Sequence, residues 1–162
     1  MKKVLLILLV LLLGFLLLGC GSAKAEQAPQ VKEDNKETVT KLVEEFGSKL
    51  QNVSLLAPED VLRKAMEENY GQYVAQALLA EWQKNPQVAP GKLTSSPWPD
   101  RIEIESADKL TDTAYDVKGY IIELTSVEKE KGGYAARRPI TLKVEKSEAN
   151  WLITEVSLGE YE

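Results

Sequence analysis

The sequence predicts an α+β fold, in which three N-terminal helices pack on a curved, four-stranded antiparallel meander. Two observations support this. After residue 35, apolar residues first recur at three- and four-residue spacing, and later alternate with polar residues between short turns. Helices in one block and strands in the next are typical of α+β domains. Residues 35–162 are long enough to form a single domain with its own core.

Three amphipathic helices are expected between residues 35 and 86. The stripe of the first helix is Val39, Leu42, Val43, Phe46 and Leu50. The second helix begins at Pro58, ends near Gly71, and has the stripe Val61, Leu62, Ala65 and Met66. The third helix ends before Pro86, and its stripe is Val74, Ala77, Leu78 and Trp82.

Four strands are expected after the helices, starting at Arg101 and covering residues 101–106, 114–126, 138–146 and 151–159. Short turns between them favour an antiparallel meander. The stretch "VEKEKGG", residues 127–133, is expected to be a charged, solvated loop. In the second strand the apolar parity changes at Gly119, which predicts a bulge or a sharp bend there.

The N-terminus has the features of an export signal. Lys2 and Lys3 precede an apolar run of 15 residues, Val4 to Leu18, and small residues follow it. This run is shorter than the roughly 20 residues that a membrane span needs. The stretch "LLGC", residues 17–20, resembles the lipobox of bacterial lipoproteins. An ordinary signal peptide or an uncleaved anchor is the alternative.

The lipobox resemblance implies that residues 1–19 are a signal peptide and that Cys20 becomes a diacylated first residue. Cys20 is the only cysteine in the chain, and two acyl chains on one residue give stable membrane anchoring. We therefore expect the protein on the extracytoplasmic face of the cell membrane. Residues 20–34 are small, polar and charged, which predicts a flexible tether.

The charge of the mature chain argues against nucleic acid as a partner. Without Lys2 and Lys3, 18 basic residues remain against 25 acidic ones, a net charge of −7. An acidic body does not bind nucleic acid non-specifically. The partners expected are the membrane, through the lipid on Cys20, and an unidentified protein or small ligand.

The order of elements suggests a known superfamily. Three helices followed by a long, bent meander resemble the cone-shaped fold of the nuclear-transport-factor-2-like (cystatin-like) superfamily, and the resemblance covers Thr38 to Glu162. The segment "PGKLTSSPWPDRIEI" is similar to a feature of uncharacterised bacterial lipoproteins of this general shape. The superfamily includes isomerases, dehydratases, accessory subunits of secretion machines and binding modules, so the resemblance does not choose a function.

The residue types present exclude several kinds of chemistry. The chain has no histidine, and its one cysteine is assigned to lipid attachment, which excludes serine–histidine triads, cysteine–histidine pairs and zinc or copper sites with imidazole or thiolate ligands. It also has no glycine-rich phosphate loop and no dinucleotide fingerprint, so we expect no cofactor. A carboxylate in an apolar pocket, aided by tyrosine, is the remaining catalytic option.

Asp100 is the carboxylate that the sequence favours for a site. Alternation along the strand places Asp100 with Ile102 and Ile104, and Arg101 on the other face, so the two are not expected to pair. Hairpin geometry places Glu123 and Arg138 at the same end of the sheet. We expect Asp100, Glu123 and Arg138 to meet at the open end of the core, near Trp98. A solvated or structural ion pair is the alternative.

Trp98 stands between two prolines, which restrict its backbone and reduce the entropy lost on binding. It is either a plug at the end of the core or an exposed anchor for a partner. Trp82 and Trp151 are expected in the core, because both belong to apolar stripes.

The leading functional expectation is a non-catalytic, lipid-anchored binding module that acts through the open end of the core or the exposed sheet face. One alternative is a small enzyme that uses Asp100 for proton transfer, with Tyr115 or Tyr120 nearby. Another is an accessory subunit of an envelope secretion or conjugation complex. The sequence does not decide the oligomeric state, and a homodimer is one alternative.

Overall fold

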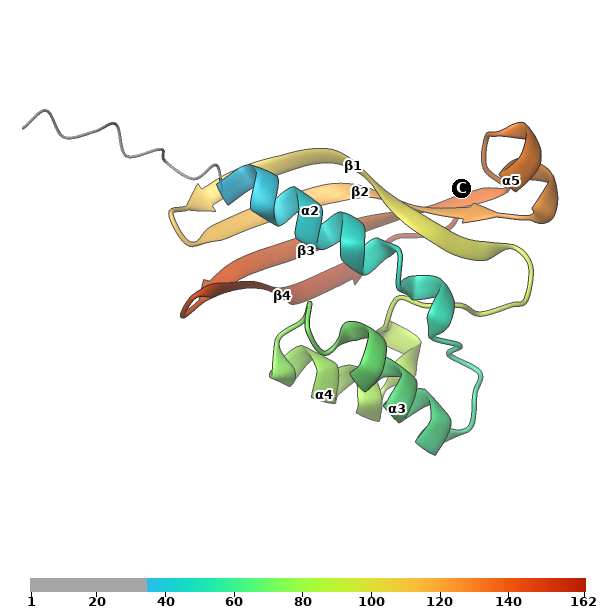
Figure 1. Ribbon diagram of the computed structural model, residues 1–162, viewed down its shortest axis with the longest axis horizontal. Coiled ribbons are helices and arrows are strands. Elements are labelled where there is room, and N and C mark those ends of the chain that lie inside the picture. Colours follow the sequence, from blue (N-terminus) through green and yellow to red (C-terminus); the bar gives the residue numbers. More distant parts are fainter. Residues whose placement is uncertain (1–34) are drawn as a thin grey trace, which may run out of the picture. The chain divides into compact units, whose positions relative to one another are not determined.

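A computed structural model describes residues 35–162 (Figure 1). The predicted signal peptide, the lipidation site Cys20 and the predicted tether lie outside the described residues. Within residues 35–162, four α-helices and a four-stranded antiparallel sheet form an α+β fold, as the sequence predicts. Three of these helices precede the sheet and the fourth lies between its second and third strands.

The first described helix, α2 (Asn35–Gly47), lies across the sheet (Figure 1). Its buried side is Val39, Val43, Phe46 and Gly47. A Cβ atom added to Gly47 would lie 2.6 Å from the backbone nitrogen of Ile102, so glycine allows the end of α2 to approach the first strand closely. The helix ends at Gly47. Leu50, which was expected in its apolar stripe, is buried but belongs to a short 3-10 turn, η1 (Leu50–Asn52).

Helices α3 (Glu59–Tyr70) and α4 (Gln76–Lys84) follow, and a second 3-10 turn, η2 (Pro86–Val88), leads to the sheet. Pro58 directly precedes α3 at the N-cap position, so the helix begins one residue after its predicted start, and Val61 is exposed rather than part of the buried stripe. Val74 is buried before α4 begins, where it bridges Ile153 in the last strand. Val74 is therefore buried by its pairing with the last strand and not as part of the helical stripe that the sequence predicted.

The sheet order is β1-β2-β3-β4, all antiparallel. The strands are β1 (Trp98–Thr111), β2 (Ala114–Leu124), β3 (Ala136–Ser147) and β4 (Asn150–Leu158). Alternate residues of β2 and β3, such as Val117, Ile121 and Ile140, join the buried core with the helices. The opposite side of the sheet is here called the outer face.

The predicted bulge at Gly119 is wrong in its location. Strand β2 pairs with β3 without interruption, whereas β1 shifts register three times against β2, between Pro99 and Arg101, Ile104 and Ser106, and Lys109 and Thr111. Gly119 lies opposite the second shift, and a Cβ there would come within 2.1 Å of the Glu103 carbonyl oxygen. Gly119 thus allows close contact with a bulge in the neighbouring strand.

The stretch expected to be a loop contains helix α5 (Ser126–Lys131). The Thr125 hydroxyl accepts a hydrogen bond from the Val127 amide at 3.1 Å, and the Glu128 carboxylate accepts one from the Thr125 amide at 3.0 Å. The sequence pattern Thr-x-x-Glu, residues 125–128, is typical of this reciprocal capping box. The prediction of a loop was wrong because the stretch is short and has no apolar stripe.

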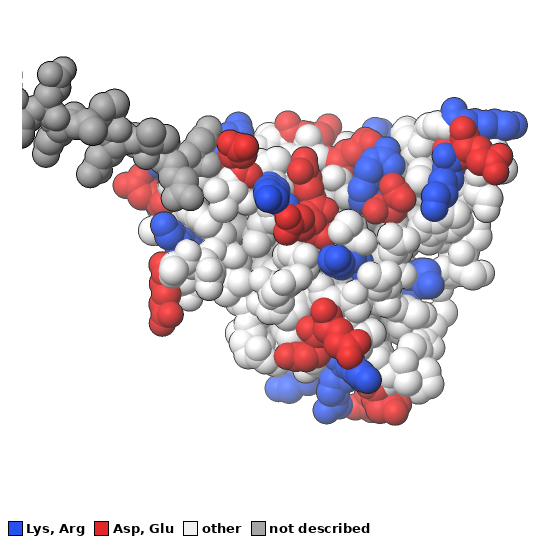
Figure 2. Space-filling view, in the orientation of Figure 1, with Lys and Arg blue, Asp and Glu red and all other residues white. Residues whose placement is uncertain are grey.

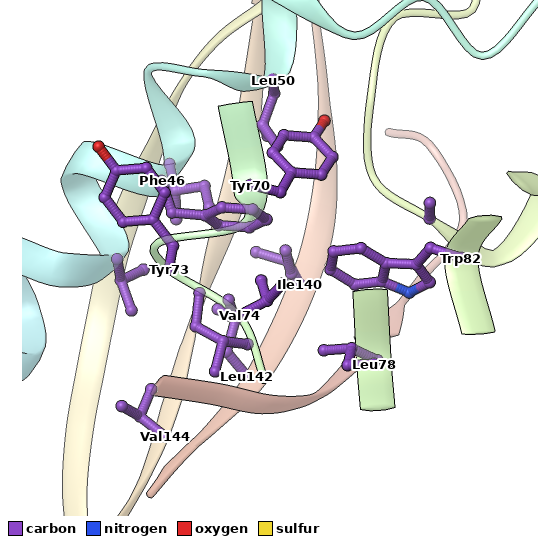
Figure 3. Packing of buried hydrophobic residues seen from close by; sticks show 14 of the residues in the cluster. Phe46, Leu50, Tyr70, Tyr73, Val74, Leu78, Trp82, Ile140, Leu142 and Val144 are labelled. Carbon is purple, nitrogen blue, oxygen red and sulfur yellow. The ribbon is translucent and has the colours of Figure 1, made fainter. Parts of the chain in front are cut away.

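The core between the helices and the sheet is built around aromatic rings (Figure 3). Phe46 packs edge-on against Tyr70 at 5.1 Å between centroids and lies parallel to Trp82 at 6.3 Å. The Tyr70 hydroxyl donates a hydrogen bond of 2.8 Å to the Pro90 carbonyl, and burial raises the pKa of its phenol. Trp82 and Trp151 are both buried, which confirms their prediction as core residues.

In residues 35–162, none of the helices has the length and apolar character that crossing a membrane requires.

Candidate functional site

The predicted site residues lie at one end of the sheet, where β1 begins, β2 ends and β3 begins. Trp98 pairs with Leu124, Pro99 with Glu123, and Arg138 with Ile121. Because side chains alternate along strands, Glu123 and Arg138 share the helix-covered face with Ile121. Trp98 shares the outer face with Leu124. The sheet therefore divides the predicted residues between its two faces.

Glu123 and Arg138 come together with Tyr161, which the sequence did not predict. Glu123 is 8% exposed, and its carboxylate accepts a hydrogen bond of 2.9 Å from the Tyr161 hydroxyl. The Arg138 guanidinium lies 5.0 Å from the centre of the Tyr161 ring, and its Nε donates a 2.7 Å hydrogen bond to the Gly159 carbonyl. We call Glu123, Arg138 and Tyr161 the sheet-end cluster.

The position of Tyr161 depends on the C-terminal residues, which extend the pairing of β4 with β3. The Gly159 amide donates to the Pro139 carbonyl at 2.9 Å, and the Arg137 and Glu162 backbones exchange hydrogen bonds of 3.2 and 2.9 Å. These bonds hold the tail against β3 and direct Tyr161 across it toward Glu123. Sequence reasoning missed Tyr161 because nothing in the sequence after Gly159 indicates that the tail returns to the sheet.

Burial controls the electrostatics of the sheet-end cluster. Removal from water raises the pKa of Glu123, and the Tyr161 hydrogen bond and the positive charge of Arg138 oppose this only in part. Burial also raises the pKa of Tyr161, and the negative charge of Glu123 adds to the effect. The cluster contains a carboxyl group and a phenol joined by a hydrogen bond, which are groups that can hold or transfer a proton, beside a guanidinium that stays charged.

The expectation that Asp100 and Arg101 do not pair is wrong. Arg101 Nη1 lies 3.0 Å from Asp100 Oδ2, and Arg101 Nε donates a 3.0 Å hydrogen bond to Glu103. Asp100 is the extra residue at the first register shift of β1, so simple alternation fails at this position. Within residues 35–162, no hydrogen bond or ion pair joins Asp100 to Glu123 or Arg138.

Trp98 is neither a buried plug nor fully exposed. It is half-buried at the start of β1, and its pairing with Leu124 places it on the outer face. Ile122 and Leu124 are buried on this same face, at 2% and 6% exposure, near the end covered by α5. Trp98 thus borders a small apolar cluster that is separate from the main core.

A second group of side chains surrounds that cluster on the outer face. The Arg137 guanidinium lies 4.5 Å from the centre of the Tyr120 ring and 5.6 Å from that of Tyr134, and it forms a 2.6 Å ion pair with Glu162. Tyr134 is 49% exposed. We call Trp98, Tyr120, Tyr134 and Arg137 the outer patch. The sequence signal for this patch was the apolar alternation after Gly119, which places Tyr120, Ile122 and Leu124 on the same face of β2.

Surface grooves lie elsewhere. One runs along the charged side of α3, one lies between α2 and the edge of β1, and two flank β4. Figure 2 shows acidic and basic side chains mixed on the helix-covered side, including over α3, with uncharged surface between them. Asp100 lines none of these four grooves, although Arg101 borders the one beside β1. No cluster among residues 35–162 groups three acidic or thiol side chains as a metal site would.

Comparison of the chain with protein-family models, with curated proteins and with solved structures found no match.

Proposed function

We propose that this protein is a lipid-anchored, extracytoplasmic binding module, without catalytic activity, that recognises a partner protein through the outer patch. The observation that carries the proposal is the aromatic and arginine surface formed by Trp98, Tyr120, Tyr134 and Arg137. Tryptophan, tyrosine and arginine are the residue types that dominate binding energy at protein interfaces. The lipid anchor is the part of the proposal that rests on the lipobox resemblance.

The outer patch combines an apolar floor with fixed polar groups. Ile122 and Leu124 are buried on the same face, where Leu124 pairs with Trp98 and Ile122 with Arg137 on the neighbouring strands. Arg137 is held between two tyrosine rings and by Glu162, which reduces the entropy it would lose on binding. A partner that covers this surface gains apolar contact and a guanidinium fixed in place.

Asp100 supports this proposal better than it supports catalysis. Its carboxylate is engaged by Arg101, and both side chains are only partly buried. A proton-transfer base would instead need an unengaged carboxylate in a closed apolar pocket. The accessory-subunit alternative is compatible with the same patch, because such a subunit also binds a protein partner.

Site-directed photo-crosslinking in cells tests the proposal. A photoreactive phenylalanine derivative at Tyr134 should give a discrete adduct with a protein partner, and Trp98→Ala should weaken it. The matched control places the same group at Leu56, which is 71% exposed on the segment between η1 and α3. An adduct from position 56 alone, or none from either position, would contradict the outer patch as the binding surface.

A further inference from the structure

The last strand of the sheet has a free edge that is only partly covered. Strand β4 is an edge strand, and residues 73–75 already lie alongside it. The Ile153 amide donates a 2.9 Å hydrogen bond to the Tyr73 carbonyl, and the Ile153 carbonyl accepts one of 2.8 Å from the Ala75 amide. The fold itself therefore adds a short parallel segment to this edge and then turns away into α4.

Beyond Ile153, the edge exposes backbone groups. Leu158 pairs with Ile140, and Val156 with Leu142. The Gly159 amide donates to the Pro139 carbonyl, so residue 159 directs its backbone toward β3. Because this direction alternates along an antiparallel strand, Val156 and Leu158 direct their amide and carbonyl groups to the free edge. No backbone bond from outside the sheet reaches either residue within the described part of the chain.

A groove accompanies this free edge. Its walls are Leu78, Glu81 and Trp82 of α4, Val88 of η2, and residues 154–157 of β4. Val88 is 42% exposed, and Val156 is half-buried. In Figure 1, β4 is the strand at the margin of the sheet nearest α4. An added strand would have unpaired backbone groups on one side, and Glu81 of α4 with the exposed Val88 of η2 on the other, because Leu78 and Trp82 are buried.

The rim of the groove is acidic. Glu81 is exposed on α4 and makes no ion pair within residues 35–162. Glu155, on the β4 side, forms a 3.1 Å ion pair with Lys143, but Lys143 also contacts Glu145 at 3.3 Å. One lysine is thus shared between two carboxylates. The charge at this rim fits a partner segment that carries lysine or arginine.

The opposite edge of the sheet lacks these features. Strand β1 has three extra residues along its length, and the groove beside it includes Arg101, Glu103 and Glu105. Bulges and charged side chains of this kind protect an edge from pairing with another chain. The single irregularity of β4 lies at the Lys143–Val144 step, before the free stretch begins.

We propose that the β4 edge from Val156 to Leu158 binds a short extended segment of a partner protein as an added strand. The segment places an apolar side chain against Val88, and a lysine or arginine beside Glu81 and Glu155. Main-chain hydrogen bonds supply affinity in this mode of recognition, and the side-chain positions supply specificity. The proposal does not depend on the outer patch, because it uses different residues.

Nuclear magnetic resonance of the full chain in detergent tests this site. The probe is a short peptide that alternates lysine and valine. The amides of Val156 and Leu158 should shift and exchange more slowly with solvent when it binds. Glu81→Lys should weaken binding about tenfold, a change of roughly 1.4 kcal/mol. The matched control is Glu130→Lys, the same charge reversal on exposed α5, which should leave binding unchanged.

Four comparisons make the test decisive. A peptide N-methylated at alternate amides, and one with glutamate in place of lysine, should both bind much more weakly. Equal binding of either, or equal shifts along the β1 edge, would overturn the proposal. Concentration-dependent shifts of Val156 and Leu158 without peptide would assign the edge to a second copy of the chain, which would also overturn it.

Discussion

At the scale of single residues, Glu123 is the clearest source of pH dependence. Its folded-state pKa is raised by burial above the ordinary value of 4.5. The folded protein therefore holds a proton that the unfolded chain has released, and stability falls as pH rises from about 4.5 through the raised pKa. We predict that the free energy of unfolding of Glu123→Gln increases relative to that of wild type as pH rises through this window. Chemical unfolding at a series of pH values measures the difference.

The control for this residue is Glu130→Gln, which removes an exposed carboxylate of α5. Because glutamine keeps an acceptor for the Tyr161 hydroxyl, the comparison isolates the cost of the buried charge from the loss of a hydrogen bond. The same pH profile for both variants would show that burial of Glu123 does not control the effect.

At the scale of elements, helix α5 depends on its capping box. It has only 6 residues and no buried side chain, so propensity and packing contribute little to it. We predict that Thr125→Ala, which removes the capping hydroxyl, costs about 1 kcal/mol. The loss should be local: hydrogen exchange of the α5 amides should accelerate, while the amides of β2 and β3 keep their protection.

Ser126→Ala is the matched control, since Ser126 is the exposed first residue of α5 and the capping box is formed by Thr125 and Glu128. Faster exchange in both variants alike would show that the hydroxyl of Thr125 has no special role. Faster exchange throughout the sheet would show instead that α5 is part of the cooperative core.

At the scale of the whole molecule, periodicity predicted the layers but not the contacts between their ends. The stripes that include Phe46, Met66 and Trp82 needed only helical spacing, and the structure buries all three. Asp100 was misjudged because a bulge breaks the alternation on which its prediction depended. Tyr161 was missed because its position depends on a tail that pairs with β3 across 38 residues of sequence from Glu123. Local patterns do not encode such long-range contacts.

If the protein is attached to a membrane, the proposed lipid on Cys20 would have to hold it there, because the acidic chain would be repelled by an anionic lipid surface. Fourteen residues, 21–34, separate Cys20 from α2, and an extended chain of that length spans at most about 50 Å. The lipid would therefore hold the outer patch and the β4 edge within reach of partners at the same membrane. We predict that wild type incorporates an alkyne-labelled fatty acid and fractionates with membranes, whereas Cys20→Ser loses both properties. Loss of the label with full membrane retention would instead indicate an uncleaved anchor formed by the run from Val4 to Leu18, and would refute lipidation as the means of attachment.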